Sequence, residues 1–332
     1  MRSEKIYSIG VIGLGVFGAR HASICLNHPN FRLVGVADVK GELVESYSKE
    51  FGVPGFTDYR GLLAVPEMDA VTIAVSDQFH HDPCKDSAQK GIHIFLEKPI
   101  ADTSTHAKEI LDAVREHDVK LMVGHTLRFD PRYLAIKRVV DEGKLGEIVH
   151  VYARRNATVK SGRRLQGRVD AMIFQGVHDI DFLQWLTGSK VSKVYAEATS
   201  NILKDLKVND TTMATLRFEN GVIGLLEQSW ALPADMPSPL DVELEVVGTE
   251  GSAYLDLRSQ SISIVSDGKL NQPDLIYGLP DQHFLFDEYN HLAKYLSGEI
   301  EARVSGEEAL SALEVAEAIM HSAKSGNPIL LA

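Results

Sequence analysis

The sequence is short of cysteine, of positive charge and of long apolar runs, and each shortage excludes a class of protein. Its two cysteines, Cys25 and Cys84, lie far apart with no zinc-type spacing, so we expect buried thiols in a reducing compartment. No stretch approaches about 18 consecutive apolar residues, and residues 1–5 lead into a strand-like run without an apolar signal segment. Lysine and arginine number 34 against 46 acidic residues, and the net charge of −12 disfavours generic nucleic-acid binding. These shortages predict a cytoplasmic protein without membrane or nucleic-acid partners.

Short strands and helical stretches alternate over the first part of the chain. The predicted strands are β-branched runs that read as buried on both faces, which is typical of a doubly wound parallel sheet. They lie at 9–12, 33–37, 70–75, 93–96 and 120–123. After Gly124 the strands become longer and alternate in polarity, with a hairpin signal at 219–221. We therefore expect an α/β protein of two domains, 1–124 around the parallel sheet and 125–332 with an α+β fold around an open, largely antiparallel sheet.

The first predicted strand runs into a glycine-rich loop that precedes a helical stretch. Glycines in this context allow a tight turn and let a pyrophosphate approach the backbone N–H groups of the helix N-terminus. At the end of the second strand, the Asp38 carboxylate would bind the adenosine ribose and repel a 2′-phosphate, although Lys40 weakens that preference. The pattern predicts a Rossmann domain that binds NAD rather than NADP, with S-adenosylmethionine binding as the alternative. The predicted loop contacts are Gly13, Gly15, Val16, Phe17 and Gly18.

A second motif, Glu97-Lys98-Pro99, follows the strand at 93–96. A charged pair at the carboxyl end of a parallel strand lies where such sheets bind ligands. Four further motifs stand in order along the chain, SDQFH at 76–80, GHTLRFDP at 124–131, GVHDID at 176–181 and GTEG at 248–251. Together with the glycine loop they resemble the Gfo/Idh/MocA family, which includes glucose-fructose oxidoreductase and inositol dehydrogenase. The resemblance implies a nicotinamide ring held between two domains, and no metal.

The resemblance also implies roles for individual residues. Lys98 would face the reacting C–O group, where an ammonium can hydrogen-bond a developing alkoxide. Glu97 would orient the turn or contact the nicotinamide ribose. Ser76 and His80 would line the cofactor groove, although the family's usual Pro-Asn pair is Asp-Gln at 77–78 in this chain. His125 and Arg128, in the motif at 124–131, are further candidates for substrate contact.

A predicted helix carries Phe174, His178, Asp181 and Trp185 at i, i+4, i+7 and i+11, which places them on one face. Catalytic members of the family have Asp-x-x-x-His here, with the histidine as general acid or base. This chain has His178 but carries Phe174 at the aspartate position. We expect His178 to be catalytic, and the alternative is a packing residue in a member that has lost the chemistry. Phe174 could face a sugar ring while Asp170 or Asp181 orients the imidazole.

The segment at 154–168 contains five arginines, one lysine and no acidic residue. Guanidinium groups bind phosphate or carboxylate through two parallel hydrogen bonds, so Arg163 and Arg164 are candidates for an anionic substrate group. A solvated loop or an oligomer contact explains the segment equally well.

The sequence thus predicts an NAD-dependent dehydrogenase that oxidises a secondary hydroxyl of a cyclic sugar, polyol or sugar derivative, including anionic and nucleotide-linked ones. His178 would take the hydroxyl proton and Lys98 would stabilise the oxygen. Two alternatives remain, an NAD-dependent redox glycosidase of the same family and a non-catalytic NAD-sensing regulator. Because an open sheet with an apolar face needs covering, we expect a homo-oligomer, either dimer or tetramer.

Overall fold

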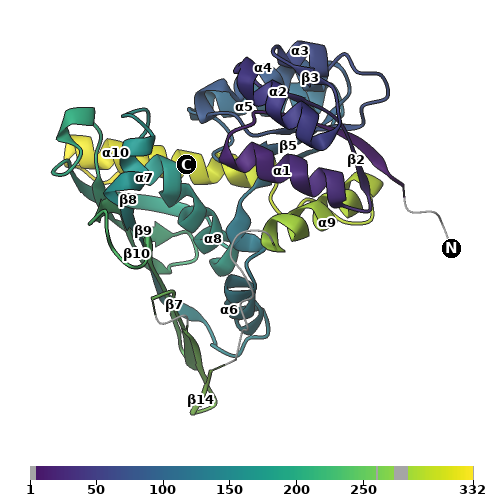
Figure 1. Cartoon of the computed structure of the whole chain (residues 1–332). Coiled ribbons are helices and arrows are strands. Elements are labelled where there is room, and N and C mark those ends of the chain that lie inside the picture. Colours follow the sequence, from purple (N-terminus) through teal and green to yellow (C-terminus); the bar gives the residue numbers. More distant parts are fainter. Residues whose placement is uncertain (1–4, 259–260, 273–282, 332) are drawn as a thin grey trace. The chain divides into compact units, whose positions relative to one another are not determined.

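The computed structural model describes residues 5–258, 261–272 and 283–331 of the chain (Figure 1). These residues form two compact units. The first unit contains residues 5–129 and 283–310, and the second contains residues 130–258, 261–272 and 311–331. The sequence placed the domain boundary between 124 and 125, so the first unit differs from the expected domain mainly by taking in the later segment. None of the helices in the described part of the chain could span a membrane.

The first unit is built on a six-stranded sheet in the order β3-β2-β1-β4-β5-β6, with all neighbours parallel. This confirms the predicted doubly wound sheet. Its strands are β1 (Tyr7–Ile12), β2 (Phe31–Ala37), β3 (Gly55–Phe56), β4 (Ala70–Ile73), β5 (His93–Glu97) and β6 (Leu121–Gly124). The strand order reverses between β1 and β4, and ligands of such sheets bind at the carboxyl ends beside that reversal.

Helices and short helical turns connect these strands. They are α1 (Val16–Asn27), α2 (Gly41–Phe51), α3 (Tyr59–Leu62), η1 (Asp77–Phe79), α4 (His81–Gln89), α5 (Ser104–Glu116) and η2 (Thr126–Arg128). The late helix α9 (His283–Ser297) also belongs to this unit and lies beside α1 in Figure 1. Its residues Tyr289, Leu292 and Leu296 are buried in the same core as Tyr7 and Phe31. A segment far along the chain therefore completes the first hydrophobic core.

The second unit contains a nine-stranded sheet in the order β14-β13-β12-β11-β7-β10-β9-β8-β15. Only the pairing of β7 with β10 is parallel among the strand pairs described, so the predicted largely antiparallel sheet is confirmed. The strands are β7 (Ile148–Thr158), β8 (Val191–Thr199), β9 (Thr211–Phe218), β10 (Ile223–Leu232), β11 (Leu240–Gly248), β12 (Gly251–Asp256), β13 (Ser261–Ser266), β14 (Lys269–Asn271) and β15 (Ile329–Leu330). The helical elements are α6 (Pro131–Asp141), α7 (Val159–Arg164), η3 (Met172–Gly176), α8 (Val177–Thr187) and η4 (Lys204–Leu206). The division between the two units falls within helix α10 (Gly306–Ser325), after residue 310.

The central strand β7 has two different faces because successive side chains point to opposite sides of a sheet. Val151, Ala153 and Ala157 are buried on the face where Arg155 binds Asp179 of α8. The opposite face carries half-buried polar side chains. The sheet therefore has one face packed against a helix and one face open.

Candidate functional site

The glycine loop between β1 and α1 has the geometry of a dinucleotide-binding loop. Gly13 has φ +92°, and a Cβ there would lie 2.6 Å from the Ala74 carbonyl oxygen. A Cβ on Gly18 would lie 1.8 Å from the Gly13 oxygen, whereas one on Gly15 would meet nothing within 4 Å. Helix α1 begins at Val16 with no acidic side chain in its first turn and no side-chain cap. The outer glycines thus permit close packing, and the middle one leaves room for a pyrophosphate at an uncapped helix N-terminus.

Asp38 follows β2 and is tied to this loop by its own carboxylate. One oxygen accepts a hydrogen bond from the Leu14 N–H at 2.7 Å, and the other accepts one from the Lys40 N–H at 2.9 Å. A carboxylate has about four lone-pair sites, so each oxygen can still accept a ribose hydroxyl. Val16 and Phe17 are exposed at the start of α1. The residues of this loop therefore fit the adenosine and pyrophosphate of NAD.

This arrangement predicts the choice of cofactor. NAD should bind at least about tenfold more tightly than NADP, because the Asp38 charge repels a 2′-phosphate. Asp38→Asn keeps an acceptor for the Leu14 N–H but removes the charge, so it should reduce the difference between the NAD and NADP affinities. Asp38→Ala should reduce this difference too, and it should also weaken NAD binding. Calorimetric titration of both cofactors measures the ratio, and equal affinities in the wild type would contradict the assignment.

Glu97, at the end of β5, holds the backbone of Lys98 in place. Its Oε2 accepts a hydrogen bond from the Lys98 N–H at 3.2 Å, and its Oε1 lies 2.9 Å from His21 Nε2. His21 Nδ1 lies 3.2 Å from the Tyr289 hydroxyl, which is 2.8 Å from Thr72 Oγ1. Because a carboxylate only accepts, His21 Nε2 donates to Glu97. The sequence analysis missed His21 and Tyr289. The one signal that could have indicated them is that each is a polar residue within the apolar stripe of a helix.

The charge state of Glu97 follows from these contacts. Burial raises the pKa of the Glu97 carboxyl. The hydrogen bond and charge of His21, together with the charge of Lys98, lower this pKa by more than burial raises it. The net pKa is below the ordinary value, so Glu97 is ionised at neutral pH. We conclude that Glu97 positions the turn that carries the half-buried Lys98.

His80 lies deeper than the sequence suggested. Its side chain is 0% exposed, with Nδ1 2.9 Å from the Pro99 carbonyl oxygen and Nε2 3.2 Å from that of Val75. Burial lowers its pKa. His80 thus joins the residue after β4 to the turn after Lys98, whose peptide bond to Pro99 is cis, and its predicted place along the cofactor groove stays a prediction. Ser76 is half-buried just before η1.

The two candidates from the motif at 124–131 are buried within the first unit. Arg128 is 2% exposed, and its Nη1 donates to the Arg303 carbonyl oxygen and to Glu308 Oε1, both at 2.7 Å. His125 is 1% exposed. Arg128 therefore anchors the segment that leads into α10, and the predicted substrate contact is not supported for it.

In the second unit, His178 lies in the first turn of α8, directly after a π-helical turn, η3. Single π turns are uncommon and are frequent near functional sites. Phe174 in this turn packs against Trp230, with ring centroids 6.2 Å apart, and borders an apolar cluster. Asp170 accepts a hydrogen bond from the Asn209 N–H, and burial raises its pKa. The half-buried His178 thus stands at an irregular point of an otherwise regular helix.

The residue after His178 fixes α8 to the sheet. Arg155 of β7 donates from Nη2 and Nε to the two oxygens of Asp179, at 2.7 and 2.8 Å. Gln228 donates to the same carboxylate at 2.7 Å, and the Tyr133 hydroxyl lies 3.0 Å from Arg155. Burial lowers the pKa of Arg155, but the charge of Asp179 and its hydrogen bond raise it more, so the guanidinium stays charged. This network holds the start of α8, and with it the backbone of His178.

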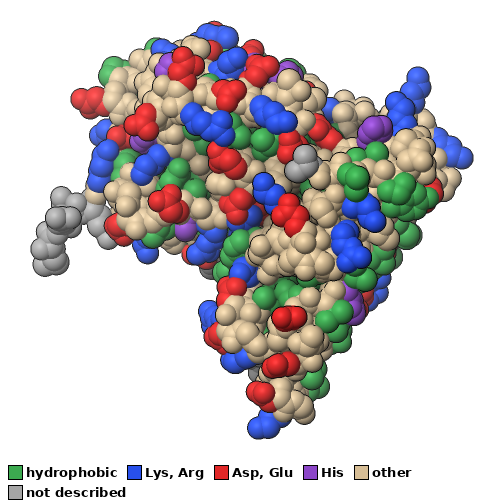
Figure 2. Space-filling view, turned by 180° about the vertical axis from the view of Figure 1, so that it is seen from behind, with side chains coloured by type: hydrophobic (Ala, Val, Ile, Leu, Met, Phe, Trp, Pro, Cys, Tyr) green, Lys and Arg blue, Asp and Glu red, His purple; other side chains and the backbone are tan. Residues whose placement is uncertain are grey.

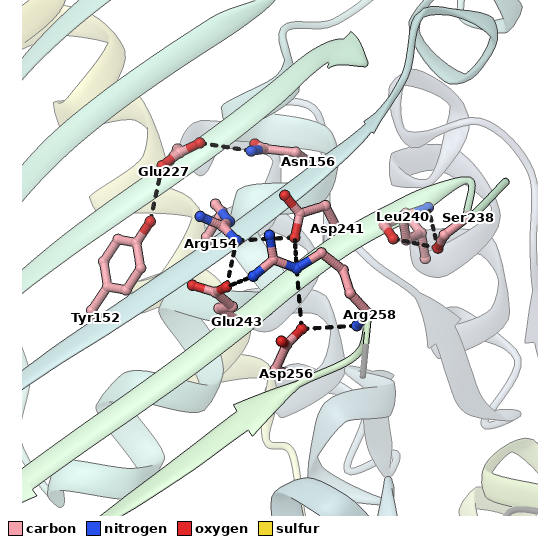
Figure 3. Close-up of polar contacts among 10 residues, drawn as sticks. All are labelled: Tyr152, Arg154, Asn156, Glu227, Ser238, Leu240, Asp241, Glu243, Asp256 and Arg258. Carbon is pink, nitrogen blue, oxygen red and sulfur yellow. Dashed lines mark hydrogen bonds and ion pairs between the residues drawn. The ribbon is translucent and has the colours of Figure 1, made fainter. Parts of the chain in front are cut away.

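The neighbouring Arg154 points to the open face of the sheet, as Figure 3 shows. It pairs with Asp241 at 3.0 Å and with Glu243 at 2.6 Å, and Arg258 of the next hairpin joins both carboxylates. Glu227 on β10 accepts hydrogen bonds on the same face. Their donors are Tyr152 and Asn156.

The arginine-rich segment is therefore largely neutralised within its own unit. Arg163 is paired with Asp205 at 2.7 Å on the surface, in addition to the pairs made by Arg154 and Arg155. Acidic and basic side chains are interspersed over much of the face drawn in Figure 2. These three arginines thus have carboxylate partners inside the unit, which fits the solvated-loop alternative, and an anionic ligand for Arg163 and Arg164 stays a prediction. Arg164 is exposed.

Two family models match the chain. The model described as an oxidoreductase family with an NAD-binding Rossmann fold matches residues 7–125, and the GFO/IDH/MocA C-terminal domain matches residues 133–254. The chain belongs to the Gfo/Idh/MocA family. This Gfo/Idh/MocA protein therefore uses an NAD-binding Rossmann domain, as its glycine loop and Asp38 indicated.

Curated relatives of this family are similar over most of the chain. Scyllo-inositol 2-dehydrogenase (NAD(+)) of Bacillus subtilis is 28% identical over 333 residues, covering 97% of this chain and 95% of that protein. Inositol 2-dehydrogenase 2 of Saccharopolyspora erythraea is 30% identical over 253 residues, covering 75% and 73%. The crystal structure of scyllo-inositol dehydrogenase from Lactobacillus casei with NAD(H) and scyllo-inositol superposes with a TM-score of 0.84 at 21% identity, covering 98% and 99%. That structure shows that the fold is shared.

Proposed function

We propose that the protein is an NAD-dependent dehydrogenase that oxidises a secondary hydroxyl of a cyclic polyol, sugar or sugar derivative. The observation that carries the proposal is the ionised Glu97, which binds the backbone of Lys98 at the end of β5. That end lies on the opposite side of the strand reversal from Asp38, where the nicotinamide half of a dinucleotide is expected. The inositol dehydrogenases among its relatives support a cyclic polyol as substrate.

Each protein group has a distinct task in this reaction. NAD, when bound, supplies the hydride acceptor. The Lys98 ammonium donates a hydrogen bond to the substrate oxygen and stabilises the negative charge that develops on it. The neutral His178 imidazole accepts the hydroxyl proton. The Arg155–Asp179 pair keeps the first turn of α8 in place while the proton moves.

The proposal is tested by incubating the purified protein with NAD and a panel of neutral cyclic polyols, neutral sugars, acidic sugars and nucleotide-linked sugars. A dehydrogenase accumulates NADH in step with a ketone product for at least one compound. A redox glycosidase instead releases a leaving group with no net NADH, and a non-catalytic regulator binds NAD without turnover. Either of those results would replace the dehydrogenase assignment.

We assign substrate binding to the second unit, and we also propose that its open face pairs with a second copy of the chain. The strand register places Tyr195, Met213, Leu225 and Tyr254 on the same face as Arg154, so apolar and charged side chains alternate across it. Exposed apolar side chains of this kind favour association. Light scattering should give the mass of a dimer or tetramer, and Met213→Glu should lower it. A monomeric wild type would contradict this assignment.

A further inference from the structure

Helix α9 carries a carboxyl group in the middle of its apolar stripe. Leu285, Tyr289, Leu292 and Leu296 are buried at helical spacing, and Glu288 lies in the same stripe with 0% exposure. Neither of its carboxyl oxygens has a hydrogen-bond partner among residues 5–258, 261–272 and 283–331. A buried polar group without a partner costs stability, so its presence calls for a specific explanation.

Helix α9 packs against β5 through Tyr289, whose ring centroid lies 5.3 Å from that of Phe95, and Glu288 is close enough to Glu97 for the two charges to interact. Tyr289, the next residue, contacts His21, which donates to Glu97. Burial, together with the negative charge of Glu97, raises the pKa of Glu288 well above its ordinary value. Two carboxyl groups in one buried region do not both ionise, and His21 and Lys98 favour the charged form of Glu97. Burial and the charge of Glu97 therefore favour the neutral form of the Glu288 carboxyl over its charged form.

A protonated carboxyl offers one O–H donor and one carbonyl acceptor. A primary carboxamide offers the complementary acceptor and donor, so the two groups can form two parallel hydrogen bonds. NAD carries such a carboxamide on its nicotinamide ring, and the glycine loop with Asp38 accounts for the other half of the cofactor. We propose that the buried Glu288 side chain binds the nicotinamide carboxamide of NAD as a neutral acid–amide pair. This inference concerns the cofactor and stands whatever the substrate.

The test compares NAD with ADP-ribose, which keeps the adenosine and pyrophosphate but lacks nicotinamide. Glu288→Leu should weaken NAD binding about tenfold or more, because two hydrogen bonds are lost, and change ADP-ribose binding by less than about twofold. Glu288→Gln keeps one donor and one acceptor and should bind both ligands nearly as the wild type does. Calorimetric titration of the four protein–ligand pairs, beside the wild type, measures this without turnover. Equal loss of both ligands, or loss of neither, in Glu288→Leu would overturn the proposal.

Infrared difference spectroscopy on the wild-type protein gives a second measurement that needs no leucine variant to fold. Adding NAD should shift the carbonyl stretch of a protonated carboxyl, and adding ADP-ribose should not. The shifted band should be missing from Glu288→Gln. A spectrum in which NAD leaves this band unchanged would show that the carboxamide binds elsewhere.

Discussion

Alanine at Lys98 or at His178 is expected to lower kcat by roughly 10²–10⁴ while leaving the affinity for NAD within a few-fold. In the proposed reaction Lys98 supplies the hydrogen bond that strengthens as charge develops on the substrate oxygen, and His178 takes the proton. Both interactions act in the transition state, so their loss appears in kcat more than in cofactor binding. Steady-state kinetics on the best substrate of the panel, together with NAD titration, measures the two quantities.

Matched controls separate this effect from general damage. Lys90→Ala and His321→Ala remove the same side-chain types at exposed positions and should leave kcat unchanged. If both residues act in one step, the double variant should lose less activity than the product of the single losses, because groups that act as a unit are not additive. Near-normal turnover in His178→Ala would reduce that residue to a packing role.

The second large effect concerns the ion pair that fixes α8. Asp179→Ala should lower the free energy of unfolding of the second unit by about 3–5 kcal/mol, since it leaves a buried guanidinium without its carboxylate. The Arg155 and Asp179 side chains are only 11% and 3% exposed, and the Gln228 amide also loses its acceptor. Both tryptophans, Trp185 and Trp230, belong to the second unit, so their fluorescence in a denaturant titration reports on it.

The chain offers a control for this measurement in the pair of Arg163 and Asp205. These side chains are 50% and 58% exposed, and solvent screens an exposed pair strongly. Asp205→Ala should therefore lower the free energy of unfolding far less than Asp179→Ala does. Equal losses in Asp179→Ala and Asp205→Ala would show that burial does not govern these pairs.

The features that were predictable from sequence are local ones. The GLGVFG loop needs particular backbone angles and close contacts that only glycine allows, and the parallel strands are apolar on both faces, so short stretches indicate both. The position of Lys98 after β5 follows from the same strand pattern. These are properties that a residue carries in its immediate neighbourhood.

The features that sequence reasoning missed depend on contacts between distant segments. Arg154 and Arg155 are adjacent, but strand alternation sends them to opposite faces, where carboxylates from β11 and α8 neutralise them. No local pattern links either arginine to its partner. Tyr289 and Glu288 likewise lie near Glu97 in the fold, although their helix α9 follows Glu97 by nearly two hundred residues in the sequence.

The discontinuity of the first unit bears on how the protein is made. During synthesis the ribosome releases residues 5–129 long before α9, so the growing chain holds the sheet without the helix that completes its core. Until α9 is made, Phe31 and Phe95 lack the Tyr289 ring that packs against both. His21, which donates to Glu97, also lacks its contact with the Tyr289 hydroxyl. A truncated chain that ends at the domain boundary expected from sequence would keep that exposed surface permanently. The Rossmann unit therefore gains its full stability only after α9 and most of the second unit have been translated.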